Sequence, residues 1–248
     1  MAVMPLVKHF LRVTFYYKVN FIFTFGVPVA SIIYSLREQL LQRPDERDTM
    51  GLILYWAGYM VVLYALLNSG PALVVLREEQ FLKMFLFITG TRWKIIAARF
   101  LSQLLILCLS VIILDLICAI LFSLPVLKLI GLSLLVIMIC ELPVYFLFLI
   151  FAVLPLRQET ITPIINVLIF IFIFISLNSF TTVPVAEGLL VILNPIEYAS
   201  QTGWALLDLL NGVLPLTRIF LIAAATFLYL LTGYFALKRI RILPIFRN

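Results

Sequence analysis

Two acidic residues lie within long apolar stretches and are the first candidates for chemistry. Asp115 lies in the apolar run 100–124, and Glu141 lies in the run 129–154. Measured from the turn at 125–128, they lie about 15 and 20 Å along two antiparallel helices, at 1.5 Å per residue. We therefore expect both carboxyl groups at similar depth, near the middle of a bilayer. A charge there costs a few kcal/mol, so each carboxyl should be protonated, paired or in contact with water.

Two interpretations of this pair remain open. Asp115 and Glu141 could form a polar patch on a path through the membrane, suited to a cationic substrate. Alternatively, they are neutral acids that hydrogen-bond between helices, with Pro143 loosening the backbone nearby.

The pair Glu78–Glu79 with Lys83 is a third acidic candidate, because it comes close to the EExxxR motif of an intramembrane protease family. That chemistry needs histidines within the membrane to bind a metal or to activate water. The only histidine is His9, which lies outside the apolar runs. The same fact excludes a Ser-His-Asp set in the spans. We expect no enzymatic activity from this chain.

The composition indicates a membrane protein. Apolar residues make up 64% of the chain and charged residues 12%, whereas soluble domains average about 25% charged residues. Several apolar runs reach the ~20 residues that cross a bilayer as a helix, and they lack the alternation of a β-barrel. The three cysteines lie in these runs without CxxC spacing, so we expect neither a disulfide nor a metal site.

The apolar runs predict an all-α polytopic membrane protein, residues 1–248 forming a single transmembrane domain. Six spans are expected, at 19–36, 51–76, 100–124, 129–154, 162–177 and 220–237. Thirteen of the eighteen Lys and Arg residues then fall on the side of both termini, which places the termini in the cytosol by the positive-inside rule. This distribution also explains the net charge of +6 without nucleic-acid binding. The expected location is the plasma (inner) membrane.

Three further segments lie outside the spans. Residues 1–18 are predicted to form an interfacial amphipathic helix, although they could equally be the cytosolic start of the first span. Residues 178–217 are apolar but cut by proline, asparagine and glycine into two short helices, at about 185–193 and 196–210. This segment could re-enter the outer leaflet as a gate, with Asn194, Pro195 and Tyr198 as its candidate residues. The alternative is an amphipathic loop that rests on the membrane.

The third segment, 77–99, carries five of the basic residues between two apolar runs. Phe81, Met84, Phe85 and Ile88 recur at helical spacing and predict one apolar face. Gly90 suits the end of this helix and Thr91 can cap the next one. The helix is too short to cross a bilayer, so we expect it at the inner surface, presenting these residues to the cytosol: Arg77, Glu78, Glu79 and Lys83.

This layout resembles the type-2 ABC transporter permease family. The local match is the acidic cluster at 77–79, followed by a short helix and then by a small-residue turn with Arg92 leading into the third span. Asn194-Pro195, followed by Tyr198, is similar to an Asn-Pro found in the outer segment of that family. The resemblance covers nearly the whole chain in layout and about thirty residues in motif. One difference is Gln80, which stands where many members have glycine.

The resemblance implies a coupling helix at 77–89 that sits in a groove of a separate ATP-binding subunit. The implied coupling residues are Arg77, Glu78, Glu79, Lys83, Phe85 and Arg92. The chain has no GxxxxGK[ST] motif, so it is expected to bind no cofactor, and ATP and magnesium would lie on that partner. A second permease chain, identical or different, would complete the path, and ATP-driven rocking of the spans would alternate access.

The implied function is ATP-driven export of a peptide, an antimicrobial or another amphipathic compound, or immunity to it. The alternative is a non-transporting scaffold or sensor in the membrane whose cytosolic helix docks a partner. An ATP-binding subunit that is encoded beside the gene and co-purifies with this chain would separate the two.

Overall fold

The computed structural model describes residues 3–16, 18–37, 45–177 and 184–240, so parts of the predicted segments 1–18 and 178–217 lie outside it. Within the described residues, all regular secondary structure is helical. In chain order the helices are α1 (Val3–Tyr16), α2 (Lys18–Ser35), α3 (Glu46–Asn68), α4 (Gly70–Glu78), α5 (Phe81–Thr89), α6 (Arg92–Phe122), α7 (Val126–Phe148), η2 (Leu149–Ala152), α8 (Gln158–Leu177), α9 (Pro184–Leu193), α10 (Pro195–Leu210) and α11 (Leu216–Arg239).

Five helical segments of the described chain are long and apolar enough to cross a membrane. They are Glu46–Glu78, Arg92–Phe122, Val126–Ala152, Glu159–Ser176 and Leu216–Arg239. The all-helical architecture is therefore confirmed, with helices that are suited to crossing a membrane. The predicted first span, 19–36, falls on α2, whose apolar part Thr24–Ser35 is shorter than these five. The sixth span stays a prediction.

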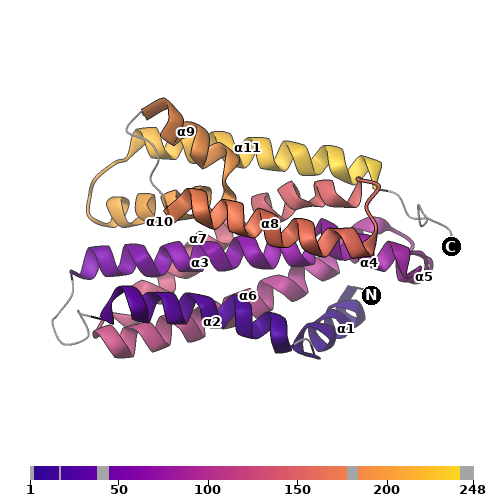
Figure 1. The fold of residues 1–248 in the computed structure, drawn as a ribbon, viewed down its shortest axis with the longest axis horizontal. Coiled ribbons are helices and arrows are strands. Elements are labelled where there is room, and N and C mark those ends of the chain that lie inside the picture. Colours follow the sequence, from indigo (N-terminus) through magenta and orange to yellow (C-terminus); the bar gives the residue numbers. More distant parts are fainter. Residues whose placement is uncertain (1–2, 17, 38–44, 178–183, 241–248) are drawn as a thin grey trace.

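The long helices run along one common direction, which gives the molecule two ends (Figure 1). One end holds α5, α1 and the C-terminal end of α11, and we call it the α5 end. The other, the far end, holds the turn at 123–125, the loop at 211–215 and the start of α3. Segments that were predicted to lie on the same side of the membrane thus lie at the same end of the fold.

Ion pairs fasten the helices at the far end. Asp208 of α10 accepts hydrogen bonds from Arg47 of α3 and Arg218 of α11, each at 2.6 Å. Lys128 of α7 also pairs with Glu46 of α3 at 2.8 Å, but both side chains are exposed. Because exposed pairs contribute little, the shielded Asp208 is the main polar link between α3, α10 and α11.

Helix α3 is the central element, and α4 continues it after a break. Ser69 separates the two helices with a non-helical backbone, and Pro71 lies in the first turn of α4. A Cβ atom on Gly70 would lie 2.1 Å from the carbonyl oxygen of Phe148. Only glycine therefore allows α4 to pack this closely against the end of α7.

Helices α9 and α10 form a hairpin that enters the fold from the far end (Figure 1). Near its tip, Tyr198 shares a 2.8 Å hydrogen bond with Thr226, and Tyr229 donates to the carbonyl of Ile192 at 2.9 Å. Thr226 and Tyr229 lie near the middle of the 24-residue α11. The hairpin thus reaches halfway along a predicted span, and the two short helices predicted in 178–217 are confirmed.

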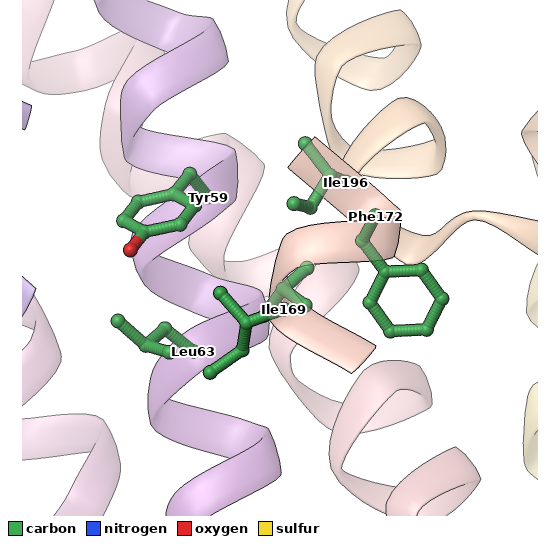
Figure 2. Close-up of a pocket in the computed structure, with 6 residues that line it drawn as sticks. Tyr59, Leu63, Ile169, Phe172 and Ile196 are labelled. Carbon is green, nitrogen blue, oxygen red and sulfur yellow. The ribbon is translucent and has the colours of Figure 1, made fainter. Parts of the chain in front are cut away.

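Helix α8 is the most loosely packed of the five long apolar segments, since only 11% of its apolar stretch is buried. Between α8, α3 and α10 lies a shallow hollow that is too tight to hold even one water molecule (Figure 2). Its walls are almost entirely apolar, and the lining residues are Tyr59, Val62, Leu63, Ile169, Phe172 and Ile196.

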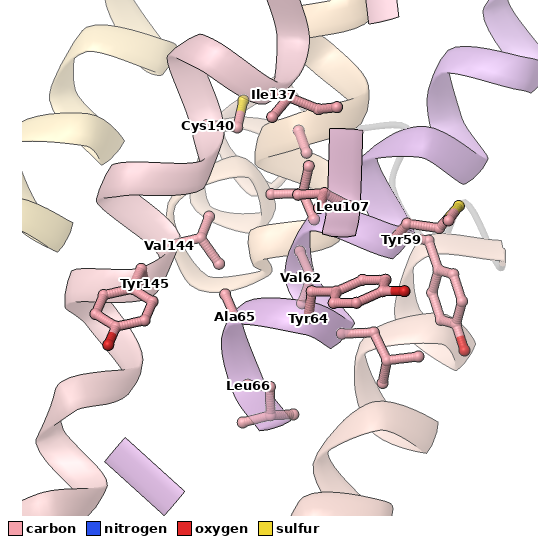
Figure 3. Packing of buried hydrophobic residues seen from close by; sticks show 14 of the residues in the cluster. Tyr59, Val62, Tyr64, Ala65, Leu66, Leu107, Ile137, Cys140, Val144 and Tyr145 are labelled. Carbon is pink, nitrogen blue, oxygen red and sulfur yellow. The ribbon is translucent and has the colours of Figure 1, made fainter. Parts of the chain in front are cut away.

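The hydrophobic core forms where α3 meets α6, α7 and α10 (Figure 3). Most of α3 is buried, so its surface needs an apolar partner in every direction. Small residues bring α10 close: a Cβ on Gly58 would lie 2.8 Å from the Cβ of Ala199. Close approach through small residues is typical of helix packing in membranes.

Candidate functional site

The predicted short helix at 77–89 is present only from Phe81 onward, as the nine-residue α5, because Arg77 and Glu78 belong to the end of α4. It ends as expected at Gly90, whose φ is +74°. Thr91 takes the position before α6, but its side chain makes no capping hydrogen bond. That part of the prediction is wrong. At the end of α5, the hydroxyl of Thr89 donates to the carbonyl of Phe85 at 2.8 Å and has the carbonyl of Thr91 within reach at 3.2 Å.

Arg77 is not presented to the cytosol. Its side chain is 1% exposed and donates to the carbonyls of Ala152 at 3.1 Å and Leu156 at 3.2 Å. Its Nε also donates to Glu78 at 2.9 Å. Because the last carbonyls of a helix lack partners within it, Arg77 satisfies the end of η2. The prediction of an exposed Arg77 is therefore wrong, and this residue joins α4 to the connection that leads into α8.

Phe85 also points inward. It is 6% exposed, and its ring contacts Phe10 of α1 edge-on, with centroids 5.7 Å apart. His9 of α1 packs against the same ring at 5.8 Å. The predicted apolar face of α5 is thus only partly correct, since Leu82, Phe85 and Thr89 are buried while Phe81, Met84 and Ile88 are exposed.

The outward side of α5 is apolar as well. Phe87 is 92% exposed, and next to this helix Trp93 of α6 is also exposed. Glu79 and Lys83, two of the predicted coupling residues, are exposed as expected. We call this surface the α5 face; it comprises Glu79, Phe81, Lys83, Met84, Phe87, Ile88 and Trp93. Exposed apolar patches outside a membrane span are typical of interaction surfaces.

Two arginines at the start of α6 connect the α5 end to other helices. Arg92, a predicted coupling residue, is exposed overall but donates to the carbonyl of Ile240 at 2.8 Å. Arg99 was not singled out from the sequence, yet its guanidinium lies 5.0 Å from the ring centre of Phe10. Arg99 also donates to the carbonyl of Asn68, where α3 ends. Contacts therefore run from α5 through Phe10 and Arg99 to the break between α3 and α4.

Glu141 lies on α7 and is 1% exposed. Its Oε1 accepts a hydrogen bond from the amide of Gln103 on α6. The remaining oxygens of this pair, Glu141 Oε2 and Gln103 Oε1, have no partner in the described part of the chain. This arrangement favours the second interpretation of Glu141, a hydrogen bond between helices. The sequence analysis missed Gln103, although a glutamine within an apolar run was a visible signal.

Asp115 lies on α6 and is fully buried. Neither carboxyl oxygen has a hydrogen-bond partner among the described residues. Ser133 of α7 lies close to Asp115, but its hydroxyl also has no hydrogen-bond partner among the described residues. Neither interpretation of Asp115 is therefore supported over the other.

The two carboxyl groups do not lie at similar depth, so that expectation is wrong. Glu141 pairs with Gln103, which precedes Asp115 by twelve positions on α6, or about 18 Å along a helix. On α7, Ser133 next to Asp115 precedes Glu141 by eight positions, or about 12 Å. Depth was misjudged because α6 begins well before residue 100 and its pairing register with α7 was unknown. One shared polar patch is excluded for these two residues.

The predicted gate residues lie together at the tip of the α9–α10 hairpin. Asn194 accepts a hydrogen bond from the backbone of Ile196 and donates to the carbonyl of Phe172 on α8, at 3.0 and 2.9 Å. Pro195 follows as the first residue of α10, a favoured position for proline. Tyr198 is fully buried. These residues hold the tip against α8 and α11, and their role as a gate stays a prediction.

Comparison with known proteins identifies no family: no family model matches this chain, and no curated protein matches it in sequence. The residues and their geometry alone therefore carry the functional argument.

Proposed function

We propose that this chain is the membrane subunit of an ATP-driven exporter of the type-2 ABC permease kind. ATP hydrolysis belongs to a separate subunit that docks on the α5 face. The substrate is a peptide, an antimicrobial or another amphipathic compound, and a second permease chain completes the path. The protein resides in the plasma membrane with both termini in the cytosol.

The observation that carries this proposal is the α5 face itself. A nine-residue helix is too short to span a bilayer, yet its outward side displays Phe87 almost fully exposed. Leaving such residues uncovered is unfavourable, and a hydrophobic groove on a partner offers the usual cover for a short helix. Glu79 and Lys83 at the rim would set the orientation of that partner.

The contacts behind the α5 face give a displacement of α5 a physical route into the membrane helices. Phe85 packs on Phe10, and Phe10 lies under Arg99. Arg99 in turn bonds to Asn68 at the end of α3. Packed side chains of this kind transmit small shifts because cores are not continuously deformable. Movement of α5 would therefore reach the break between α3 and α4.

The test compares two almost fully exposed apolar residues at opposite ends of the fold. Phe87 is 92% exposed on the α5 face, and Leu127 is 88% exposed at the far end. Each is replaced by serine, and each variant is co-expressed with any ABC ATP-binding subunit that is found encoded beside its gene. We expect Phe87→Ser to lose co-purification of that subunit and its ATPase activity, by about tenfold or more. Leu127→Ser should retain both.

A charge-reversal pair refines the test. Glu79→Lys changes the exposed rim, whereas Glu78→Lys would also remove the partner of the buried Arg77. Glu79→Lys is therefore the informative variant, and it should weaken co-purification at low salt. If the ATP-binding subunit never co-purifies with the unaltered chain, the exporter proposal is wrong and a scaffold or sensor role is favoured. Unchanged association of Phe87→Ser would show that the docking surface lies elsewhere.

A further inference from the structure

Helix α1 has an exposed basic side. Lys8 and Arg12 lie four positions apart, and residues at this spacing project from the same side of a helix. Both are exposed, and neither pairs with a carboxylate in the described part of the chain. Helix α1 itself contains no acidic residue. Its outward side therefore presents positive charge that the described fold does not compensate.

The apolar side of α1 faces the protein. Leu6, Val7 and Phe10 are buried, Phe10 packs on Phe85 of α5, and α1 also packs along α6. A helix that lies on a membrane usually buries its apolar side at the boundary of the acyl chains. In α1 that side is already covered by protein. The side that remains free to meet a membrane is the basic one.

Arg99 indicates the level at which α1 lies relative to a bilayer. Helix α6 has 31 residues, which is about 46 Å and longer than the ~30 Å hydrocarbon core. Before Asp115, its charged residues all fall within its first eight positions, at Arg92, Lys94 and Arg99. The start of α6, up to Arg99, therefore extends beyond the hydrocarbon core. Because the ring of Phe10 lies 5.0 Å from the Arg99 guanidinium, α1 lies at the level of the lipid headgroups.

The start of α6 adds positive charge beside α1. Arg92 and Lys94 are exposed, and the backbone carbonyls to which they donate carry no net charge. The acids of the α5 end lie on neither α1 nor α6. Glu78 is paired within the fold, Glu79 belongs to the α5 face, and Glu159 lies in the first turn of α8. The charge around α1 is therefore predominantly positive.

We propose that Lys8 and Arg12 bind the phosphate groups of anionic lipids in the leaflet at the α5 end. Lysine and arginine side chains near a membrane surface attract anionic headgroups. Met4 lies one turn before Lys8 and Val13 follows Arg12; they are 63% and 37% exposed and can contact the upper parts of the acyl chains. An acidic protein would have to reach between headgroups to the level of Arg99, whereas lipid phosphates are already there. The proposal goes beyond the export function and requires only that the α5 end lies at a membrane surface.

Native mass spectrometry of the full chain in detergent measures its binding of phosphatidylglycerol and of phosphatidylcholine with the same acyl chains. We expect the unaltered chain to prefer phosphatidylglycerol. Lys8→Gln combined with Arg12→Gln should lower the affinity for this lipid by about tenfold or more and leave phosphatidylcholine binding unchanged. The matched control, Lys238→Gln combined with Arg239→Gln, removes the same charge from the end of α11, where both residues are exposed. It should keep most of the preference.

A charge-preserving variant separates loss of charge from loss of fold. Lys8→Arg combined with Arg12→Lys should bind phosphatidylglycerol as the unaltered chain does. The proposal is overturned if the unaltered chain shows no preference. Equal losses in the two glutamine pairs also overturn it, because the attraction would then come from the net charge of the α5 end. Displacement of the lipid by inorganic phosphate, but not by chloride of equal ionic strength, would show a site for free anions instead.

A protein partner on the basic side of α1 gives a different result. Lys8→Gln combined with Arg12→Gln would then lose co-purification of an ATP-binding subunit and keep its preference for phosphatidylglycerol, which overturns the lipid proposal. None of the lipid measurements needs an ATP-binding subunit. Failure of the exporter proposal and failure of lipid binding by α1 are therefore distinguishable.

Discussion

A buried arginine is tolerated only when its donors meet acceptors, and Arg77 meets three. It bonds to Glu78 and to the carbonyls of Ala152 and Leu156, about 75 residues away in sequence. Its predicted exposure rested on its place in a short helix at the inner surface of the membrane. The burial of this side chain depends on where the chain returns after α7, which local sequence does not reveal.

Gln80 carries backbone strain that a single substitution should relieve. Its φ is +63°, in the left-handed region, where a residue with a Cβ is disfavoured by roughly 1–2 kcal/mol. We predict that Gln80→Gly stabilises the protein by about 1 kcal/mol, partly offset by the greater freedom of glycine in the unfolded chain. Thermal unfolding in detergent measures the change. Gln80→Ala is the control, because it removes the side chain and keeps the strain; an equal gain from alanine would contradict the explanation.

Because Gln103 and Glu141 are hydrogen-bonded to each other, we predict that the effects of replacing them on the free energy of unfolding are not additive. Glu141→Met leaves the Gln103 amide buried without its acceptor, which should cost about 1–3 kcal/mol. Removing both partners, in Gln103→Leu combined with Glu141→Met, should recover most of that loss. Unfolding of the single and double variants in detergent gives the coupling energy.

Replacement of Asp115, the other buried acid, is the control for these variants, because its carboxyl group has no hydrogen bond to lose in the described structure. Asp115→Val should therefore leave stability unchanged or raise it. A large loss of stability on Asp115→Val, or simple additivity at Gln103 and Glu141, would contradict these assignments. Transport lost in Asp115→Val with stability retained would instead favour a place on the substrate path.

At the scale of elements, α5 shows why an apolar pattern alone could not orient a helix. Its sequence, FLKMFLFIT, is apolar on nearly every side. Helical spacing selected Phe81, Met84, Phe85 and Ile88, but the buried side centres on Leu82 and Phe85. Contact with α1 determines which side of α5 is buried, because Phe10 of α1 packs on Phe85. The residues left over became the exposed α5 face.

Packing between α3 and α10 depends on a glycine, and a matched substitution should expose this dependence. An added Cβ at Gly58 would lie 2.8 Å from Ala199, whereas one at Gly131 in α7 meets nothing within 4 Å. We predict that Gly58→Ala destabilises the protein by about 1–3 kcal/mol through overpacking. Gly131→Ala should instead stabilise it by up to about 1 kcal/mol, because alanine is the better helix former. Unfolding in detergent measures both, and an equal effect of the two would contradict close packing of the hairpin on α3.

At the scale of the whole molecule, the fold separates the α5 face from the ion-paired far end (Figure 1). The export proposal requires these ends to lie on opposite sides of the membrane. We predict that Lys83→Cys is labelled by an impermeant maleimide only when the cytosolic side is accessible. Leu214→Cys, in the loop of the far end and 62% exposed, should be labelled in intact cells. Labelling of the unaltered protein gives the background from its native cysteines. Labelling of Lys83→Cys in intact cells would show that the α5 end faces the exterior, contrary to the export proposal.

The sequence by itself determined the class of this protein and most of its helices. Runs of apolar residues longer than a soluble core needs are costly in water, so they specify membrane helices whatever the packing. Glycine and proline likewise marked the end of α5 at Gly90 and the tip of the hairpin at Asn194-Pro195, because backbone preferences are local.

Only the tertiary structure decided which side chains are buried and which groups meet. Arg77 was placed inside by carbonyls from a distant segment. Asp115 and Glu141 were placed at different depths by the register of α6 against α7. Glu197 and Tyr55 came together through the hairpin that returns beside α3. Such contacts depend on register and side-chain volume across helices far apart in sequence, and hydrophobic periodicity carries no information about either.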